Sequence, residues 1–203
     1  MYWTFYDQNQ MIDDKNLDTV IMTMQALVDV IIPRSPELAR EFGIIQYYGG
    51  LDEYVDEYMV LTLQNQYFPL AAFVVDILDT VAYLRETEED RDYQQSHRFF
   101  EASEELRLEA LGFIREYAKE SENIPPILAD SADMLMNIYS MLIRFPMMGF
   151  YSEWSGYGST RLYPPSERVL QYRPVSWEQI DYPGPSNGYH ALRSSESIYF
   201  NIE

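Results

Sequence analysis

The chain has 203 residues and carries 33 Asp and Glu residues against 14 Lys and Arg residues, a formal net charge of −19 at pH 7. That charge argues against binding to nucleic acids or anionic membranes, because both need clustered basic side chains. The sequence contains no cysteine, so disulfides, thiolate nucleophiles and cysteine-bound metal centres are excluded. Because 47% of the residues are hydrophobic, we expect a folded chain rather than an acidic disordered tail.

Composition divides the chain into two regions. Residues 1–148 hold 27 acidic and 10 basic residues and contain long stretches of helical periodicity. Residues 149–203 are rich in glycine, proline, tyrosine and tryptophan. We therefore predict an all-α fold, with a helical bundle of about five to six helices in the first region. The second region is predicted to be an extended, loop-rich aromatic arm that packs on the helices, on a partner subunit or on both.

The first two helices are predicted from apolar spacing and from capping residues. Asn16 is the predicted cap of a helix that ends before Pro33, because the residue preceding a proline avoids the helical conformation. Ser35 followed by Pro36 is typical of a new helix start, with a capping residue before a proline at the first helical position. We expect this second helix to continue to Tyr48 and to stop at the two glycines that follow.

Four further helices complete the predicted bundle. An apolar stripe over residues 51–62 predicts the third helix. Residues 68–84 are apolar on most sides, which predicts a central, buried helix with Phe73 in the core. The longest periodic pattern covers residues 93–118, and residues 130–145 are predicted to close the bundle. Because the connections are short, we expect neighbouring helices to pack mostly antiparallel.

No segment is predicted to enter a membrane. The longest uninterrupted apolar stretch, residues 69–75, has seven residues, whereas a helix that spans a bilayer needs about 20. The first fourteen residues contain no Lys or Arg, so we expect neither a Sec nor a twin-arginine signal.

The common catalytic and metal-binding motifs are absent from the sequence. The two histidines, His97 and His190, do not stand three residues after a glutamate, which excludes the di-iron site of ferritin-like bundles. No Gly-x-Ser-x-Gly motif presents a nucleophilic serine. Residues 156–160 are glycine-rich but lack the lysine of a phosphate-binding loop. We therefore predict no catalytic, cofactor-binding or metal-binding residue in this chain, while a pair of carboxylates with an enzymatic role stays open.

The residues expected at a partner interface lie in the aromatic arm. Tyr, Trp and Arg dominate the binding energy of protein interfaces, and Tyr-Pro-Gly-Pro at residues 182–185 predicts a rigid turn. An arm with few aliphatic side chains cannot form its own core, so we expect it to lie on its own helices or on a partner. The predicted interface residues are Tyr151, Trp154, Trp177, Tyr182, Pro183, Gly184, Pro185, Tyr189 and Arg193.

Several segments resemble a known family, the gluconate 2-dehydrogenase subunit 3 family. Near the N-terminus, a helix ending in Ile-Pro-Arg and a following Phe-Gly motif are similar to the opening of that family. In the arm, a Trp…Tyr-Pro-Gly-Pro…Gly-Tyr pattern is similar to its closing stretch. The segments that carry the resemblance are residues 27–34, 41–44, 151–154, 177–185 and 188–193.

This resemblance implies a role without catalysis. In such complexes a large flavin subunit of the glucose–methanol–choline oxidoreductase type oxidises a sugar or polyol, and the small subunit carries no cofactor. The resemblance implies that this chain escorts, folds or stabilises a large flavoprotein partner that contains FAD. Many family members begin with a twin-arginine signal, so its expected absence here implies a cytoplasmic complex, or export only with a partner that carries a signal.

Two other classes of function stay open at this point. The chain could be a stand-alone acidic scaffold or a self-assembling structural protein, in which the tyrosine-rich arm grips a neighbouring copy. It could also be an enzyme that uses carboxylates which the sequence does not single out.

Overall fold

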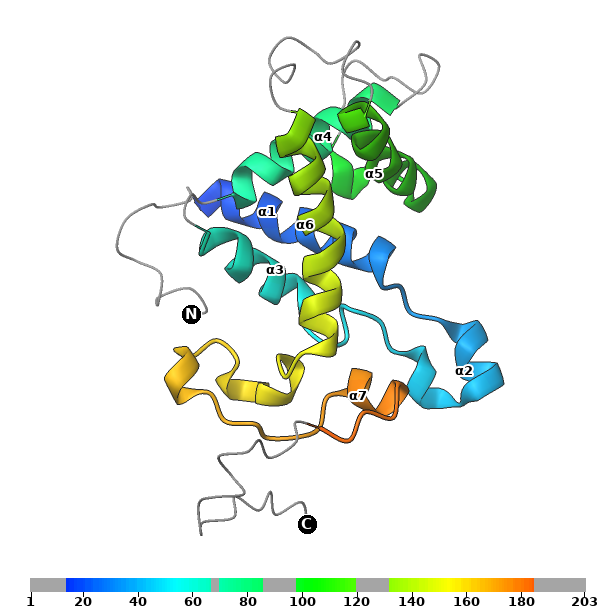
Figure 1. Ribbon diagram of the computed structural model, residues 1–203, viewed down its shortest axis with the longest axis vertical. Coiled ribbons are helices and arrows are strands. Elements are labelled where there is room, and N and C mark those ends of the chain that lie inside the picture. The colour runs from blue at the N-terminus through cyan, green and yellow to red at the C-terminus, as the bar shows by residue number, and fades with distance from the viewer. Residues whose placement is uncertain (1–13, 67–69, 86–97, 120–131, 185–203) are drawn as a thin grey trace.

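The computed structural model describes residues 14–66, 70–85, 98–119 and 132–184, and within these ranges the fold is all-α, as predicted (Figure 1). No β-strand occurs in the described ranges. The α-helices are α1 (Asp14–Ile31), α2 (Pro36–Phe42), α3 (Val55–Gln64), α4 (Ala71–Arg85), α5 (Glu104–Lys119), α6 (Ala132–Tyr151) and α7 (Val175–Gln179). Short 3-10 helices connect them: η1 (Ile44–Tyr47), η2 (Phe99–Glu101), η4 (Ser155–Thr160) and η5 (Pro165–Glu167).

Five helices share one hydrophobic core. Helix α1 packs against α3 and α4, α5 packs against α4 and α6, and α6 also packs against α3. Helix α6 runs through the middle of the view in Figure 1, while α2 projects from the bundle beside α7. The largest fully buried side chains of this core are Phe99, Met24, Leu27, Met59, Leu63, Leu78, Ile114 and Leu142.

The predicted boundary between the first two helices is confirmed. Helix α1 ends at Ile31, two residues before Pro33, and α2 begins at Pro36. Ser35 caps α2, because its Oγ accepts a hydrogen bond of 3.2 Å from the backbone N–H of Leu38. The predicted N-terminal cap of α1 is wrong, since the helix already begins at Asp14 and Asn16 lies inside it.

The prediction that the second helix reaches Tyr48 is also wrong. Helix α2 ends at Phe42 because Gly43 adopts a φ of 101°, a conformation that glycine reaches without steric cost and that breaks the helical path. The chain resumes as the separate 3-10 helix η1. This break turns α2 and η1 into a small projection instead of one long helix.

The turn that returns the chain from η1 to the bundle depends on a close approach at Gly49. A Cβ atom at this position would lie 2.5 Å from the carbonyl oxygen of Ile32 and 2.8 Å from the backbone nitrogen of Arg34. The neighbouring Gly50 donates its N–H to the same Ile32 carbonyl over 2.8 Å. The turn therefore packs directly against the end of α1, and a side chain at Gly49 would separate them.

We expect Gly49→Ala to lower the free energy of unfolding by about 1–3 kcal/mol, because the added methyl group meets backbone atoms that cannot give way. The matched control is Gly112→Ala in α5, where a Cβ atom meets nothing within 4 Å. That substitution should stabilise the protein by about 0.5–1 kcal/mol through helix propensity. Urea unfolding measures both changes, and a stabilising Gly49→Ala would contradict the packing described for this turn.

Helix α4 corresponds to the predicted central helix, but it is not buried on most sides. Its core face consists of Ala71, Val74, Val75, Ile77, Leu78, Val81 and Ala82. The predicted core residue Phe73 is 36% exposed and lies on the opposite face with Tyr83 and Leu84. The expectation that Phe73 fills the core is therefore wrong.

The last two helices of the bundle also differ from their predicted ranges. Within residues 98–119, the pattern splits into η2 and α5, because Ser103 begins a new helix by accepting a hydrogen bond at Oγ from the N–H of Leu106. Residues 93–97 lie outside the described residues. Helix α6 continues beyond residue 145, through Pro146, to Tyr151. It thus crosses the predicted boundary between residues 148 and 149.

Candidate functional site

The predicted interface residues that the structure describes lie where the arm passes beneath the bundle (Figure 1). Six fall in the described ranges: Tyr151, Trp154, Trp177, Tyr182, Pro183 and Gly184. Three lie outside the described residues: Pro185, Tyr189 and Arg193. The described six share this end of the molecule, but their side chains have different surroundings.

The two tryptophans fix the arm to its own helices. Trp154 is 3% exposed, and its Nε1–H donates to the backbone carbonyl of Tyr54 over 2.7 Å. Its ring meets the edge of the Tyr58 ring at 5.6 Å between centroids. Trp177 is 4% exposed and donates from Nε1 to the carbonyl of Tyr151 over 3.0 Å. Both indoles therefore combine an apolar contact with a satisfied polar group, which is how buried tryptophans stabilise a fold.

The tyrosines and the turn are open to solvent. Tyr151 and Tyr182 are exposed, as is Pro183, and Gly184 is half-buried. The ring of Tyr182 stands edge-on to Trp177 with 5.1 Å between centroids. Among the described predicted residues, the tryptophans order the arm, whereas Tyr151, Tyr182 and Pro183 present surface to which another molecule has access.

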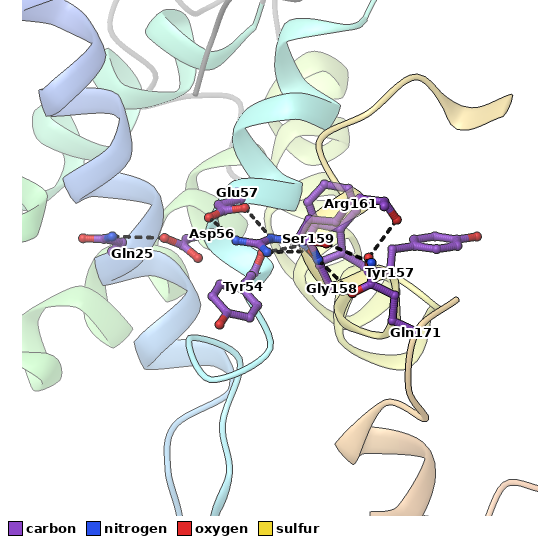
Figure 2. A network of polar contacts seen from close by, with 11 residues as sticks. Gln25, Tyr54, Asp56, Glu57, Tyr157, Gly158, Ser159, Arg161 and Gln171 are labelled. Atoms are coloured by element: carbon purple, nitrogen blue, oxygen red, sulfur yellow. Dashed lines mark hydrogen bonds and ion pairs between the residues drawn. The ribbon is translucent and has the colours of Figure 1, made fainter. Parts of the chain in front are cut away.

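An arginine from the arm forms an ion pair with the first turn of α3, as Figure 2 shows. Arg161 donates from Nε and Nη2 to the two carboxylate oxygens of Glu57, over 2.7 and 2.9 Å. Its guanidinium also lies 3.8 Å from the centroid of the Tyr54 ring. The planar guanidinium matches both the carboxylate and the aromatic face, which lysine could not do equally well. This contact fastens the start of the arm, because Arg161 also donates from Nη1 to the carbonyl of Gly158 over 2.8 Å.

A buried carboxyl group, Glu53, lies between the arm and the bundle. It is 4% exposed and accepts hydrogen bonds from the Ser155 hydroxyl and from the backbone N–H of Val175. Within the described part of the chain, no Lys or Arg forms an ion pair with it, and the charges that act on it are those of Asp52 and Glu178. Burial raises the pKa of Glu53 above that of an ordinary glutamate, while the two hydrogen bonds oppose this effect.

Helix α7 is held against η1 by two glutamines. Gln46 donates from Nε2 to the carbonyl of Gln179 over 2.8 Å. Gln179 donates in return from Nε2 to the carbonyls of Ile45 and Tyr48, over 2.9 and 3.0 Å. The projection formed by α2 and η1 and the end of the arm therefore form one continuous structural unit.

Large apolar side chains are exposed on the elements that meet at this end. Phe42 is 62% exposed and Ile44 is 71% exposed, and α2 contributes no buried residue at all. The exposed apolar residues of these elements, which we call the end group, are Leu38, Phe42, Ile44, Tyr48, Met147, Met148, Tyr151, Ile180 and Tyr182. The elements that carry these residues contact one another, and apolar surface gathered in one place is typical of a surface that binds another molecule.

Sequence reasoning missed several residues that organise this site. The pairs between Arg161 and Glu57 and between Gln46 and Gln179 join positions that carry no local signal in the sequence. The burial of Glu53 is hidden because it belongs to an acidic run. The exposure of Phe42 and Ile44 was missed as well, because the second helix was expected to continue through the glycine between them.

The described residues contain no group of three or more His, Cys, Asp and Glu side chains that could hold a metal ion. None of the helices in the described ranges is long and apolar enough to cross a membrane. Comparison of the chain with protein-family models, with curated proteins and with solved structures finds no match.

Proposed function

We propose that this chain is a non-catalytic small subunit that escorts, folds or stabilises a large flavin-dependent oxidoreductase of a sugar or polyol. FAD belongs to the partner in this proposal, and the chain described here supplies a binding surface. The proposal rests on the resemblance of its terminal segments to the gluconate 2-dehydrogenase subunit 3 family and on the way in which those segments lie together.

The observation that carries the proposal is that segments far apart in the sequence contact one another. The end of α1 leads into the turn at Ser35, whose N–H donates to the carbonyl of Tyr47 in η1 over 3.0 Å. Helix η1 is joined to α7 by Gln46 and Gln179. The segments with the resemblance are therefore linked in space. The turn that follows residues 27–34 contacts η1, which packs against α2 and residues 41–44. Helix η1 contacts residues 177–184 through Gln46 and Gln179, and Trp177 bonds to residues 151–154 at the carbonyl of Tyr151.

The exposure of this end supports a role in binding another protein. A helix of two turns is marginal in water unless its apolar face is covered, because most helix stability in proteins comes from packing. Helix α2 exposes Leu38 and Phe42 and buries nothing within the chain. Covering one large apolar side chain contributes about 1.5–3 kcal/mol. A partner bound to the end group would therefore gain binding free energy and would also stabilise α2.

Purification of the tagged chain from its native host tests the proposal. We expect it to elute with one larger protein in fixed ratio, to carry flavin absorbance only in that complex, and to be required for sugar or polyol oxidation by the larger protein. A homopolymer of this chain without flavin would contradict the proposal in favour of a structural scaffold. Turnover of a substrate by the isolated chain would contradict it in favour of an enzyme.

Surface substitutions then identify the interface. We expect Phe42→Asp and Ile44→Asp each to weaken binding of the flavoprotein about tenfold or more, because each places a charge where an apolar contact forms. The matched control is Leu108→Asp, at a residue that is 51% exposed on α5, a helix that lies away from α2 and α7 in Figure 1. All three should leave the free energy of unfolding within about 0.5 kcal/mol of the parent. Equal binding by all three variants, measured by titration calorimetry, would show that the end group is not the interface.

A further inference from the structure

Glu53 lies where three separate segments meet. It belongs to the turn that precedes α3, while its two hydrogen-bond donors come from η4 (Ser155) and from the first residue of α7 (Val175). The carboxyl group thus joins the turn before α3 to both η4 and the start of α7. Anything that changes its charge changes this contact directly.

Burial and two neighbouring acids shift Glu53 toward its neutral form, while its two hydrogen-bond donors act in the opposite direction. The groups that face it are Asp52 from its own turn, Glu178 from α7 and the phenol of Tyr172 from the arm, and none of them is a cation. The nearby arginines are engaged elsewhere, since Arg34 pairs with Asp52 over 2.6 Å and Arg161 pairs with Glu57. A buried carboxylate without a cation is costly, whereas its protonated form can both donate and accept a hydrogen bond.

We propose that Glu53 is a proton-sensitive latch, which seats residues 155–175 on the bundle when it is protonated and loosens them when it is ionised. The latch is independent of the identity of the partner and so goes beyond the function proposed above. Two end group residues, Ile180 and Tyr182, follow α7 directly. Loosening of the latch therefore also changes the surface offered to a partner.

The direction of the pH dependence follows from the pKa of Glu53, which is higher in the folded chain than its ordinary value. The stabilisation by the protonated group is fully present below the ordinary range of glutamate, at about pH 4.3. It is lost as the pH rises through the higher, folded-state pKa. The arm is therefore expected to be seated more firmly at mildly acidic pH than at alkaline pH.

Acrylamide quenching of tryptophan fluorescence tests the latch. Trp154 and Trp177 are both buried at the contact between arm and bundle, and Trp3→Phe removes the third tryptophan of the chain. In this background we expect quenching to increase as the pH rises from about 5 to 9. In Glu53→Gln it should stay low at every pH, since the amide imitates the protonated carboxyl. A difference of one pKa unit changes the seating equilibrium about tenfold.

Two further variants make the test specific. Ser155→Ala removes a donor that favours the ionised form, so the midpoint of the quenching change should rise by about one pH unit. Glu57→Gln weakens the Arg161 contact and should increase quenching without abolishing its pH dependence. Identical pH profiles for Glu53→Gln and its parent would overturn the proposal. If Glu53→Gln does not fold, an unchanged midpoint in Ser155→Ala overturns it instead, and a raised midpoint supports it.

Discussion

Replacement of Phe99 by alanine is expected to lower the free energy of unfolding by about 3–5 kcal/mol, the range for emptying a buried aromatic site. Phe99 is the largest of the side chains with no exposed surface, and it lies in η2, between α1 and α4. Its backbone is also fixed, since its N–H donates to Oδ1 of Asp79 over 2.8 Å and its carbonyl accepts from Nε of Arg107 over 3.2 Å. The backbone at residue 99 is therefore held in place, so we expect most of the space to stay unfilled. Urea unfolding monitored by circular dichroism measures the loss.

The control for this prediction is Phe73→Ala, which removes the same atoms from a residue that is 36% exposed on α4. It should cost less than about 1 kcal/mol, as most substitutions at the surface do. Equal losses of unfolding free energy in the two variants would mean that Phe73 is buried, which would contradict its exposed position on α4. The pair thus separates packing from the intrinsic effect of deleting a phenyl ring.

The difference between these two phenylalanines illustrates what hydrophobic periodicity can predict. The all-α class and the approximate places of α1, α3, α4 and α6 follow from apolar spacing, because an amphipathic helix repeats its buried positions every three to four residues. In residues 68–84, apolar residues occur on several faces, so the pattern predicts a helix without fixing which face is buried. Phe73 and Leu78 look alike in the sequence, and only packing against neighbouring helices distinguishes them.

Helix ends were predictable where a single residue imposes the backbone conformation. Ser35 with Pro36 gave the start of α2, because a cap and a fixed φ act locally. Gly43 ends the same helix through a positive φ. Because glycine can also occur inside a helix, the sequence alone does not decide whether the helix ends there or continues. Pro146 is the opposite case. It lies inside α6, where the helix continues on both sides and buries Leu142 and Phe150.

The contacts of the arm were the least predictable part of the site. Aromatic composition indicated an arm that must lie on something, and the tryptophans do carry that attachment. The polar contacts join residues about a hundred or more positions apart, such as Glu57 with Arg161. The sequence offers 33 acidic residues as partners for that arginine, so the choice depends on the tertiary fold. For the same reason Glu53 could not be told from Asp52, Asp56 and Glu57.

The second large effect is expected at Trp154, whose indole attaches the arm to the start of α3. Trp154→Ala should lower the free energy of unfolding by about 3–5 kcal/mol, because it empties the site beside Tyr58 and leaves the carbonyl of Tyr54 without its donor. Trp154→Phe keeps most of the apolar contact and loses only the hydrogen bond, so it should cost about 1–3 kcal/mol. Urea unfolding gives both values, and trypsin cleavage at Arg161 and Arg168 reports whether the arm has separated from the bundle.

The control for Trp154 is Tyr163→Ala, which removes another aromatic ring of the arm at a site that is 45% exposed. This variant should unfold like the parent and resist trypsin equally well. If Trp154→Ala increases cleavage of the arm but leaves the unfolding of the bundle unchanged, the arm is an appendage that the bundle does not need. If Trp154→Ala increases cleavage of the arm and also lowers the free energy of unfolding, the arm completes the core around α3. Any partner bound at the end group must then bind the arm and the bundle together. The burial of Trp154 and its hydrogen bond to the residue before α3 favour the second result, because removing the indole exposes the start of α3 to water.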